Sequence, residues 1–264
     1  MRDHHRRALE KAQTRLLAEH PDLLAIILGG SIAKGIEHEH SDVDLIVVVT
    51  DDGYTKRQSA NRVGFFYKDV CDYPGGYVEG RFVSRTFIAD AAARGSEPTR
   101  HSFTGVYPVY CVDPAIVAWL PKIPVYPEDQ HQAKIASFLA QMQLNQFFFW
   151  NEGKRRGDRY LQLHAATEIV LFGCRLILAE NRILFACQKR LTEQTLAAPR
   201  KPDGFDAKLN RLLTEMSDEA KEDFCKTVMA FVSFTGWPTA DPLSRFMLDV
   251  EMSWFNRTPA VAEW

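Results

Sequence analysis

The sequence predicts an α/β domain with a short mixed sheet, followed by an all-α helical bundle. Short apolar and β-branched runs alternate with helical patterns over residues 1–120, whereas residues 128–264 show helical periodicity almost throughout. Pro121, Pro124 and Pro127 separate the two parts and indicate a linker. We therefore expect one domain over residues 1–120 and a second over residues 128–264.

The first part of the chain contains four strand candidates, each an apolar or β-branched run. These candidates span residues 23–28, 43–50, 77–83 and 106–112. Helical patterns occupy residues 3–20, 31–35, 54–68 and 85–94. Strands that alternate with helices favour a single sheet with helices packed against it.

The second part of the chain consists of helical patterns. We expect helices over residues 130–150, 158–191, 206–216, 218–234 and 243–255. Helices with short connections and no strand between them favour a bundle.

The composition is that of a folded protein without a strong charge bias. The chain has 264 residues, of which 46% are hydrophobic and 25% are charged, and its formal net charge is -2. These values exclude a wholly disordered chain. Because there is no general excess of Lys and Arg, nucleic acid is not an expected partner.

Neither a membrane segment nor a secretory leader is expected. Residues 1–17 carry charges throughout, and the most apolar later stretch, residues 169–185, is interrupted by Arg175, Glu180 and Arg182. The five cysteines form no CxxC pair, which indicates a reduced, cytoplasmic protein. The sequence carries no signal for the oligomeric state.

A glycine-rich turn, Leu28-Gly-Gly-Ser-Ile-Ala-Lys-Gly35, follows the first predicted strand. Gly29 and Gly30 allow a ligand to approach the backbone, and Ser31 offers a hydroxyl donor. Backbone N–H groups in such a turn favour a phosphate. Lys34 supplies a positive charge on the same turn, so these residues together predict a phosphate-binding site.

Two aspartates, Asp42 and Asp44, stand at the start of the second predicted strand. Side chains two positions apart on a strand share one face, so the two carboxylates repel each other. A divalent cation relieves that repulsion, and paired hard oxygen ligands suit Mg²⁺. A phosphate-binding turn next to such a pair predicts an enzyme that uses a nucleoside triphosphate.

Other known motifs fit this region less well. A P-loop requires lysine after its second glycine, but Ile36 follows Gly35. The stretch His38-Glu-His-Ser-Asp42 is close to a zinc hydrolase pattern, but Val43 stands where the final histidine would be. A plain strand-to-helix turn with solvated aspartates is the structural alternative.

The glycine-serine turn, followed by Asp-x-Asp and an apolar strand, resembles the DNA polymerase beta nucleotidyltransferase superfamily. The residues that carry the resemblance are Gly30, Ser31, Asp42 and Asp44. The resemblance implies that the turn binds the triphosphate and that the aspartates bind two Mg²⁺ ions. It also implies a third carboxylate on a neighbouring strand and a nucleotidyltransferase fold for the N-terminal domain.

The third carboxylate has one first candidate and two alternatives. Glu79 lies in the strand predicted over residues 77–83, where the family places an acidic residue. Asp72 and Asp69 are alternatives, because strand boundaries predicted from sequence shift by a few residues.

The helical part is similar to that of the small-molecule nucleotidyltransferases that modify antibiotics. The similar stretch runs from Ala179 to Leu191, and the resemblance implies that Lys189 approaches the triphosphate. Relatives also use a general base from this domain, for which Glu168 is the candidate. An interhelical ion pair of Glu168 with Arg175 or another cation is the structural alternative.

The residues and the resemblance together predict an Mg²⁺-dependent transferase. It would move a nucleoside monophosphate from a nucleoside triphosphate to a hydroxyl of a small molecule, such as an aminoglycoside or lincosamide antibiotic, and release pyrophosphate. The predicted site comprises Asp42, Asp44 and Glu79 as metal ligands, Glu168 as base, and Gly29, Gly30, Ser31, Lys34 and Lys189 as nucleotide-binding residues. Transfer to a protein or an RNA end, and a non-catalytic nucleotide-binding or toxin–antitoxin module, are the alternatives.

Overall fold

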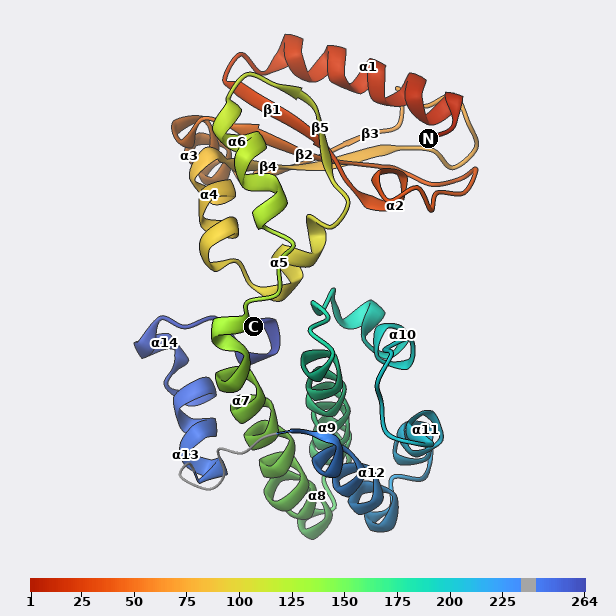
Figure 1. Cartoon of the computed structure of the whole chain (residues 1–264), viewed down its shortest axis with the longest axis vertical. Coiled ribbons are helices and arrows are strands. Elements are labelled where there is room, and N and C mark those ends of the chain that lie inside the picture. The colour runs from red at the N-terminus through yellow and green to blue at the C-terminus, as the bar shows by residue number, and fades with distance from the viewer. Residues whose placement is uncertain (234–240) are drawn as a thin grey trace. The chain divides into compact units, whose positions relative to one another are not determined.

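The computed structural model describes residues 1–233 and 241–264, which form two compact units, Met1–Val125 and Tyr126–Trp264. The boundary between the units lies between Pro124 and Pro127. The first unit combines strands and helices, and the second is rich in helices (Figure 1). The predicted fold class, an α/β region followed by a helical region, is confirmed.

The first unit is built on a five-stranded mixed sheet with the strand order β3-β4-β2-β1-β5. Its strands are β1 (Leu23–Leu28), β2 (Val43–Val49), β3 (Gly64–Tyr67), β4 (Val78–Ser84) and β5 (Tyr107–Cys111). β2 and β4 are parallel, whereas the other neighbouring pairs are antiparallel. The register of the parallel pair places Asp44 opposite Glu79.

Helices cover both faces of the sheet because side chains alternate along each strand. Leu45 and Val47 of β2 belong to the apolar cluster that contains α1, and Ile46 and Val48 belong to the cluster that contains α4 and α6. The helices of this unit are α1 (Asp3–Glu19), α2 (Gly30–Ala33), α3 (Asp51–Ser59), α4 (Arg85–Arg94), α5 (Glu97–Ser102) and α6 (Pro114–Trp119), with the 3₁₀ turn η1 (Leu120–Lys122). By the same alternation, Asp44 lies on the face of Ile46 and Val48.

The helix predicted over residues 54–68 is wrong in its second half. α3 ends at Ser59, and Gly64–Tyr67 form β3, the fifth strand. The Phe65 ring lies against β4 at Gly80, where a Cβ would come within 2.4 Å of the ring. Aromatic packing across strands outweighs a weak local helical pattern. The short helices α5 and α6, which precede the linker, were also not predicted.

The second unit packs its helices around one apolar core. Its helices are α7 (His131–Leu144), α8 (Trp150–Arg156), α9 (Arg159–Glu180), α10 (Leu191–Leu196), α11 (Phe205–Glu215), α12 (Asp218–Phe231), α13 (Pro242–Phe246) and α14 (Ser253–Asn256). Two π-helical turns, η3 (Asn145–Phe149) and η5 (Met247–Glu251), connect α7 to α8 and α13 to α14. The 3₁₀ turns are η2 (Glu128–Gln130), η4 (Gln188–Arg190) and η6 (Val261–Glu263).

α9 is the core helix of the second unit, and its residues 169–180 are all buried. By length and composition α9 could cross a membrane, but 67% of its most apolar window is buried inside the protein. Within this helix, the Arg175 guanidinium donates hydrogen bonds to the carbonyl oxygens of Ala262 and Trp264. The burial of residues 169–180 is typical of a helix at the centre of a bundle.

The helix predicted over residues 158–191 is too long. α9 ends at Glu180, where the Asn181 side chain donates to the Ile177 carbonyl at 2.8 Å and Arg182 adopts a left-handed conformation with φ 57°. An amide that bonds the last helical carbonyls competes with continuation of the helix.

Two more predicted helices differ from the structure. The helix predicted over residues 218–234 ends at Phe231, and its predicted end, Phe234, lies outside the described residues. The helix predicted over residues 243–255 is interrupted by η5.

Candidate active site

Three carboxylates gather where β2 and β4 begin. Asp42 immediately precedes β2, Asp44 lies in β2, and Glu79 lies in β4. One carboxylate oxygen from each lies within 4.8 Å of the others. Asp42 and Asp44 are half-buried and Glu79 is exposed. The structure thus brings together the three residues that were predicted as metal ligands.

The two alternative carboxylates pair with arginines of α1 instead. Asp72 accepts hydrogen bonds from Arg7 at 2.9 and 3.2 Å. Asp69 accepts hydrogen bonds from Arg15 at 3.1 and 3.2 Å. Neither belongs to the three-carboxylate cluster of Asp42, Asp44 and Glu79.

The glycine turn packs directly against Asp44. Gly30 has φ +64°, and a Cβ on Gly30 would lie 1.7 Å from Asp44 Oδ2. The backbone N–H of Gly29 donates to the Asp44 carbonyl at 2.9 Å. Gly30 is therefore required both by its left-handed backbone and by the carboxylate beside it. Ser31 follows in the first turn of α2 and does not line the cavity beside the cluster.

Hydrogen bonds hold the loop before β2 at Ser41, the residue that precedes Asp42. The Ser41 hydroxyl accepts from the His38 backbone N–H at 3.0 Å, and the Tyr73 hydroxyl donates to the Ser41 carbonyl at 2.9 Å. A hydrogen bond to Asp42 raises the pKa of Tyr77 to about 12. Among the described residues, no histidine belongs to the carboxylate cluster, so this loop shows no zinc arrangement.

Asp44 is the carboxylate of the cluster whose ionised form is most disfavoured by its surroundings. Its burial raises the pKa of this carboxyl to about 6, and the negative charges of Asp42 and Glu79 act in the same direction. The positive charges of Lys34 and Arg81 oppose the shift without cancelling it. The cluster therefore has excess negative charge near neutral pH, which a bound cation would neutralise.

A cavity of about 710 Å³ lies beside the cluster. Among the predicted site residues, it is lined by Gly29, Gly30, Lys34, Asp44 and Glu79. This size is within the range of ligand pockets in proteins, about 300–1,000 Å³.

The cavity also contains residues that were not predicted from the sequence. Phe65 and Phe66 come from β3, the strand that was missed. Arg81 lies two positions after Glu79 on β4 and donates to the Ser102 hydroxyl at 2.8 Å. Side chains two positions apart on a strand lie on the same face, so the prediction of Glu79 as a site residue could also have indicated Arg81.

The two remaining predicted residues belong to the second unit. Lys189 lies in the 3₁₀ turn η4 rather than in a helix, and it is exposed. Glu168 is half-buried on α9 and lines a separate cavity of about 280 Å³. Burial raises the pKa of the Glu168 carboxyl.

Residues 9–71 match the family model of the nucleotidyltransferase domain. The matched segment comprises 63 of the chain's 264 residues. It contains the glycine-serine turn and both aspartates of β2, whereas Glu79 lies beyond it. The match supports a transferase enzyme that uses a nucleotide substrate.

Comparisons of the whole chain add a structural similarity. No curated protein matches the sequence. The crystal structure of a nucleotidyltransferase-like protein from Exiguobacterium sibiricum is similar over 84% of this chain and 74% of its own, with 14% sequence identity and a TM-score of 0.48.

The contact between Gly30 and Asp44 predicts that alanine destabilises the protein much more at Gly30 than at Gly29. Gly30→Ala should destabilise the protein by about 1–3 kcal/mol, because Asp44 must move and alanine disfavours this backbone conformation. Gly29→Ala is the matched control, since its Cβ would meet no atom closer than 3.8 Å. Urea unfolding followed by circular dichroism measures both changes. Equal effects of the two substitutions would contradict the packing described for Gly30.

The raised pKa of Asp44 predicts that Asp44→Asn stabilises the metal-free protein. The folded-state pKa of about 6 exceeds the ordinary value of 3.8. Ionised Asp44 therefore reduces stability fully above pH 6, and this effect disappears as the pH falls toward 4. We expect a gain of about 1–3 kcal/mol at pH 7.5.

The measurement is urea unfolding of both proteins in EDTA between pH 4 and 8. The difference between them should shrink as Asp44 becomes protonated. A variant that is less stable than the wild type at pH 7.5 would show that Asp44 is not under electrostatic strain.

Proposed function

We propose that the protein transfers a nucleoside monophosphate from a nucleoside triphosphate to a hydroxyl group of a small molecule and releases pyrophosphate, with Mg²⁺ as cofactor. The observation that carries this proposal is the cluster of Asp42, Asp44 and Glu79 next to the Gly30-Ser31 turn. The nucleotidyltransferase domain match over residues 9–71 supports the same class of reaction.

The donor set of the cluster fits a hard divalent cation. Three carboxylates supply oxygen ligands of the kind that Mg²⁺ prefers. The raised pKa of Asp44 reflects negative charge that a cation would offset. We assign two Mg²⁺ ions to Asp42 and Asp44, with Glu79 holding one of them. Bound there, the ions would neutralise the triphosphate and the acceptor oxygen.

The triphosphate would lie along the glycine-serine turn. The half-buried Gly30 brings backbone close to Asp44, whereas Gly29 is buried and its N–H already bonds the Asp44 carbonyl. The Ser31 hydroxyl can donate to a phosphate oxygen. Lys34 immediately follows α2, and its charge already acts on Asp44. The cavity beside these residues is large enough for a nucleotide.

The reaction makes one bond to phosphorus and breaks another. The acceptor oxygen attacks the α-phosphorus, the bond from the α-phosphorus to the bridging oxygen breaks, and pyrophosphate leaves. The hydroxyl proton passes to a base, for which we propose Glu168. Burial raises the pKa of Glu168, which makes its carboxylate a stronger proton acceptor. The acceptor class that we propose is a hydroxylated small molecule such as an aminoglycoside or a lincosamide.

The experiment that tests this function begins with thermal shifts for the four nucleoside triphosphates, each with and without Mg²⁺. Triphosphates that stabilise the protein are then incubated with candidate hydroxylated antibiotics, and pyrophosphate release is measured. We expect an Mg²⁺-dependent thermal shift and acceptor-dependent release of pyrophosphate. Absence of any Mg²⁺-dependent nucleotide binding would contradict the proposal.

The third carboxylate is tested by two variants that remove charge and keep shape. Glu79→Gln should lower kcat at least about a hundredfold, which corresponds to roughly 2.7 kcal/mol of transition-state stabilisation. Asp72→Asn is the control and should retain activity, because its exposed ion pair with Arg7 contributes little. A severe loss in Asp72→Asn with a mild loss in Glu79→Gln would move the metal ligand to Asp72.

The proposed contact of Lys189 with the triphosphate is tested against its neighbour. Lys189→Ala should weaken triphosphate binding several-fold with little change in melting temperature, because an exposed lysine contributes little to stability. Lys189→Arg should restore binding only partly. Arg190→Ala is the control, since Arg190 pairs with Glu193 at 2.6 Å. Unchanged nucleotide affinity in Lys189→Ala would exclude Lys189 from the site.

A further inference from the structure

The helical unit contains a cavity of about 280 Å³ that the nucleotidyltransferase domain does not explain. Its lining comes from α7, η3, α9, α13, η5, α14 and the C-terminal segment. The volume is at the lower limit of ligand pockets in proteins, about 300 Å³, so an occupant must be compact.

Both π-helical turns of the unit border this cavity. η3 contributes Asn145 and Phe149, and η5 contributes Asp249 and Val250. π-Helical turns are rare and occur frequently at functional sites, because they redirect side chains at the cost of regular hydrogen bonding. Two such turns at one small cavity indicate a binding site.

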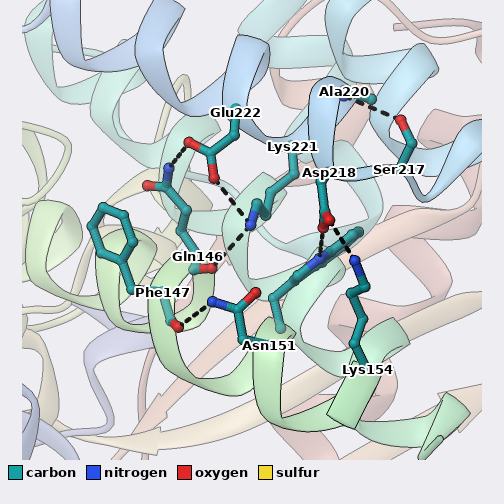
Figure 2. A network of polar contacts seen from close by, with 10 residues as sticks. Gln146, Phe147, Asn151, Lys154, Ser217, Asp218, Ala220, Lys221 and Glu222 are labelled. Carbon is teal, nitrogen blue, oxygen red and sulfur yellow. Dashed lines mark hydrogen bonds and ion pairs between the residues drawn. The ribbon is translucent and has the colours of Figure 1, made fainter.

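Side chains from α12 and α8 hold η3 in its irregular geometry (Figure 2). The Lys221 ammonium, which is 3% exposed, donates to the Gln146 carbonyl at 3.3 Å and pairs with Glu222 at 3.0 Å. The Asn151 amide donates to the Phe147 carbonyl at 2.7 Å. These bonds satisfy two carbonyl groups of the turn, between the cavity-lining residues Asn145 and Phe149.

The acidic residue of η5 already has a cationic partner. Arg245 donates to the Asp249 carboxylate at 2.7 Å and to the buried Ser137 hydroxyl at 2.9 Å. Asp249 is thus neutralised within the unit. This leaves Glu168 as the cavity carboxylate whose charge is not offset by an ion pair among the described residues.

Glu168 has no hydrogen bond or ion pair with the described part of the chain. His164, an exposed residue one turn earlier on α9, acts to lower the pKa of Glu168 but does not offset the larger effect of burial. Burial raises the pKa of the Glu168 carboxyl, as expected for an acid without a counter-charge. A ligand cation in the cavity would supply that charge.

Two buried amides at the cavity have unsatisfied atoms within the described structure. Gln141 and Asn145 are 1% and 3% exposed, and Gln141 Nε2 and Asn145 Oδ1 have no hydrogen-bond partner there. Leaving a buried polar atom unpaired costs about 1–3 kcal/mol. A ligand that accepts from Gln141 and donates to Asn145 would remove that cost.

We propose that this cavity binds a compact organic ammonium: a primary or secondary amine on a single ring that also carries an oxygen. The ammonium group would lie between Glu168 and Asn145 Oδ1, and the oxygen would accept from Gln141. The rings of Phe149, Phe172 and Phe246 line the cavity and would contact the ring and the cation.

This proposal concerns binding alone and needs neither Mg²⁺ nor a triphosphate. An ammonium bound to Glu168 would lower the pKa of this carboxyl, so amine binding would oppose the base role proposed for Glu168.

The probes that test it are 3-hydroxybenzylamine and its neutral analogue 3-hydroxybenzyl alcohol, with affinities measured by ligand-observed NMR on the full chain. We expect the amine to bind the wild type at least about tenfold more tightly than the alcohol, as a charge-assisted contact requires. Glu168→Gln should remove this preference. Glu219→Gln, on the exposed surface of α12, is the matched control and should retain it.

A second variant, Phe246→Leu, keeps the carboxylate and removes one ring. This variant should lower the affinity for the amine several-fold and the affinity for the alcohol less, because only the amine makes a cation–π contact with the ring. Asp44→Asn should bind both probes like the wild type, which separates this site from the proposed transfer reaction. Equal binding of amine and alcohol, no binding of either, or an unchanged preference in Glu168→Gln would each overturn the proposal.

Discussion

Repulsion among Asp42, Asp44 and Glu79 is the constraint on which the rest of the N-terminal unit depends. The parallel register of β2 and β4 places Asp44 opposite Glu79, and the glycine turn closes over Asp44 without space for a side chain at Gly30. The apolar faces of the sheet hold these charges together despite the cost. Carboxylates that a fold holds together at such a cost are a candidate cation site.

The parts of the fold that local pattern determines could be predicted from the sequence. β1 and β2 are continuous apolar runs, and the prolines between residues 121 and 127 coincide with the boundary between the units. β3 could not be predicted, because it forms by pairing with β4. There the Phe65 ring packs over Gly80, which has no side chain to block it. The end of α9 depends on one amide, Asn181, whose bond to the helix has no periodic signal.

The same distinction applies to the candidate site. Gly30 and Asp44 belong to a local motif, so their spacing alone predicted their chemistry. The position of Glu79 beside Asp44 depends on which strands pair, so the sequence made Glu79 the first candidate but left Asp72 and Asp69 as alternatives. The contact of Asp72 with Arg7 is visible only in the structure. The cavity of the helical unit could not be predicted at all, because it depends on π-helical turns that contacts from a distant helix stabilise.

The measurement that most directly tests the central claim is a ¹³C NMR titration of the Asp44 carboxyl carbon with and without Mg²⁺. Asp44→Asn identifies the signal by its absence. Without metal, Asp44 should titrate with a pKa of about 6, and saturating Mg²⁺ should move that pKa below the ordinary value of 3.8. A pKa near 3.8 without metal, or a titration that Mg²⁺ leaves unchanged, would contradict the account.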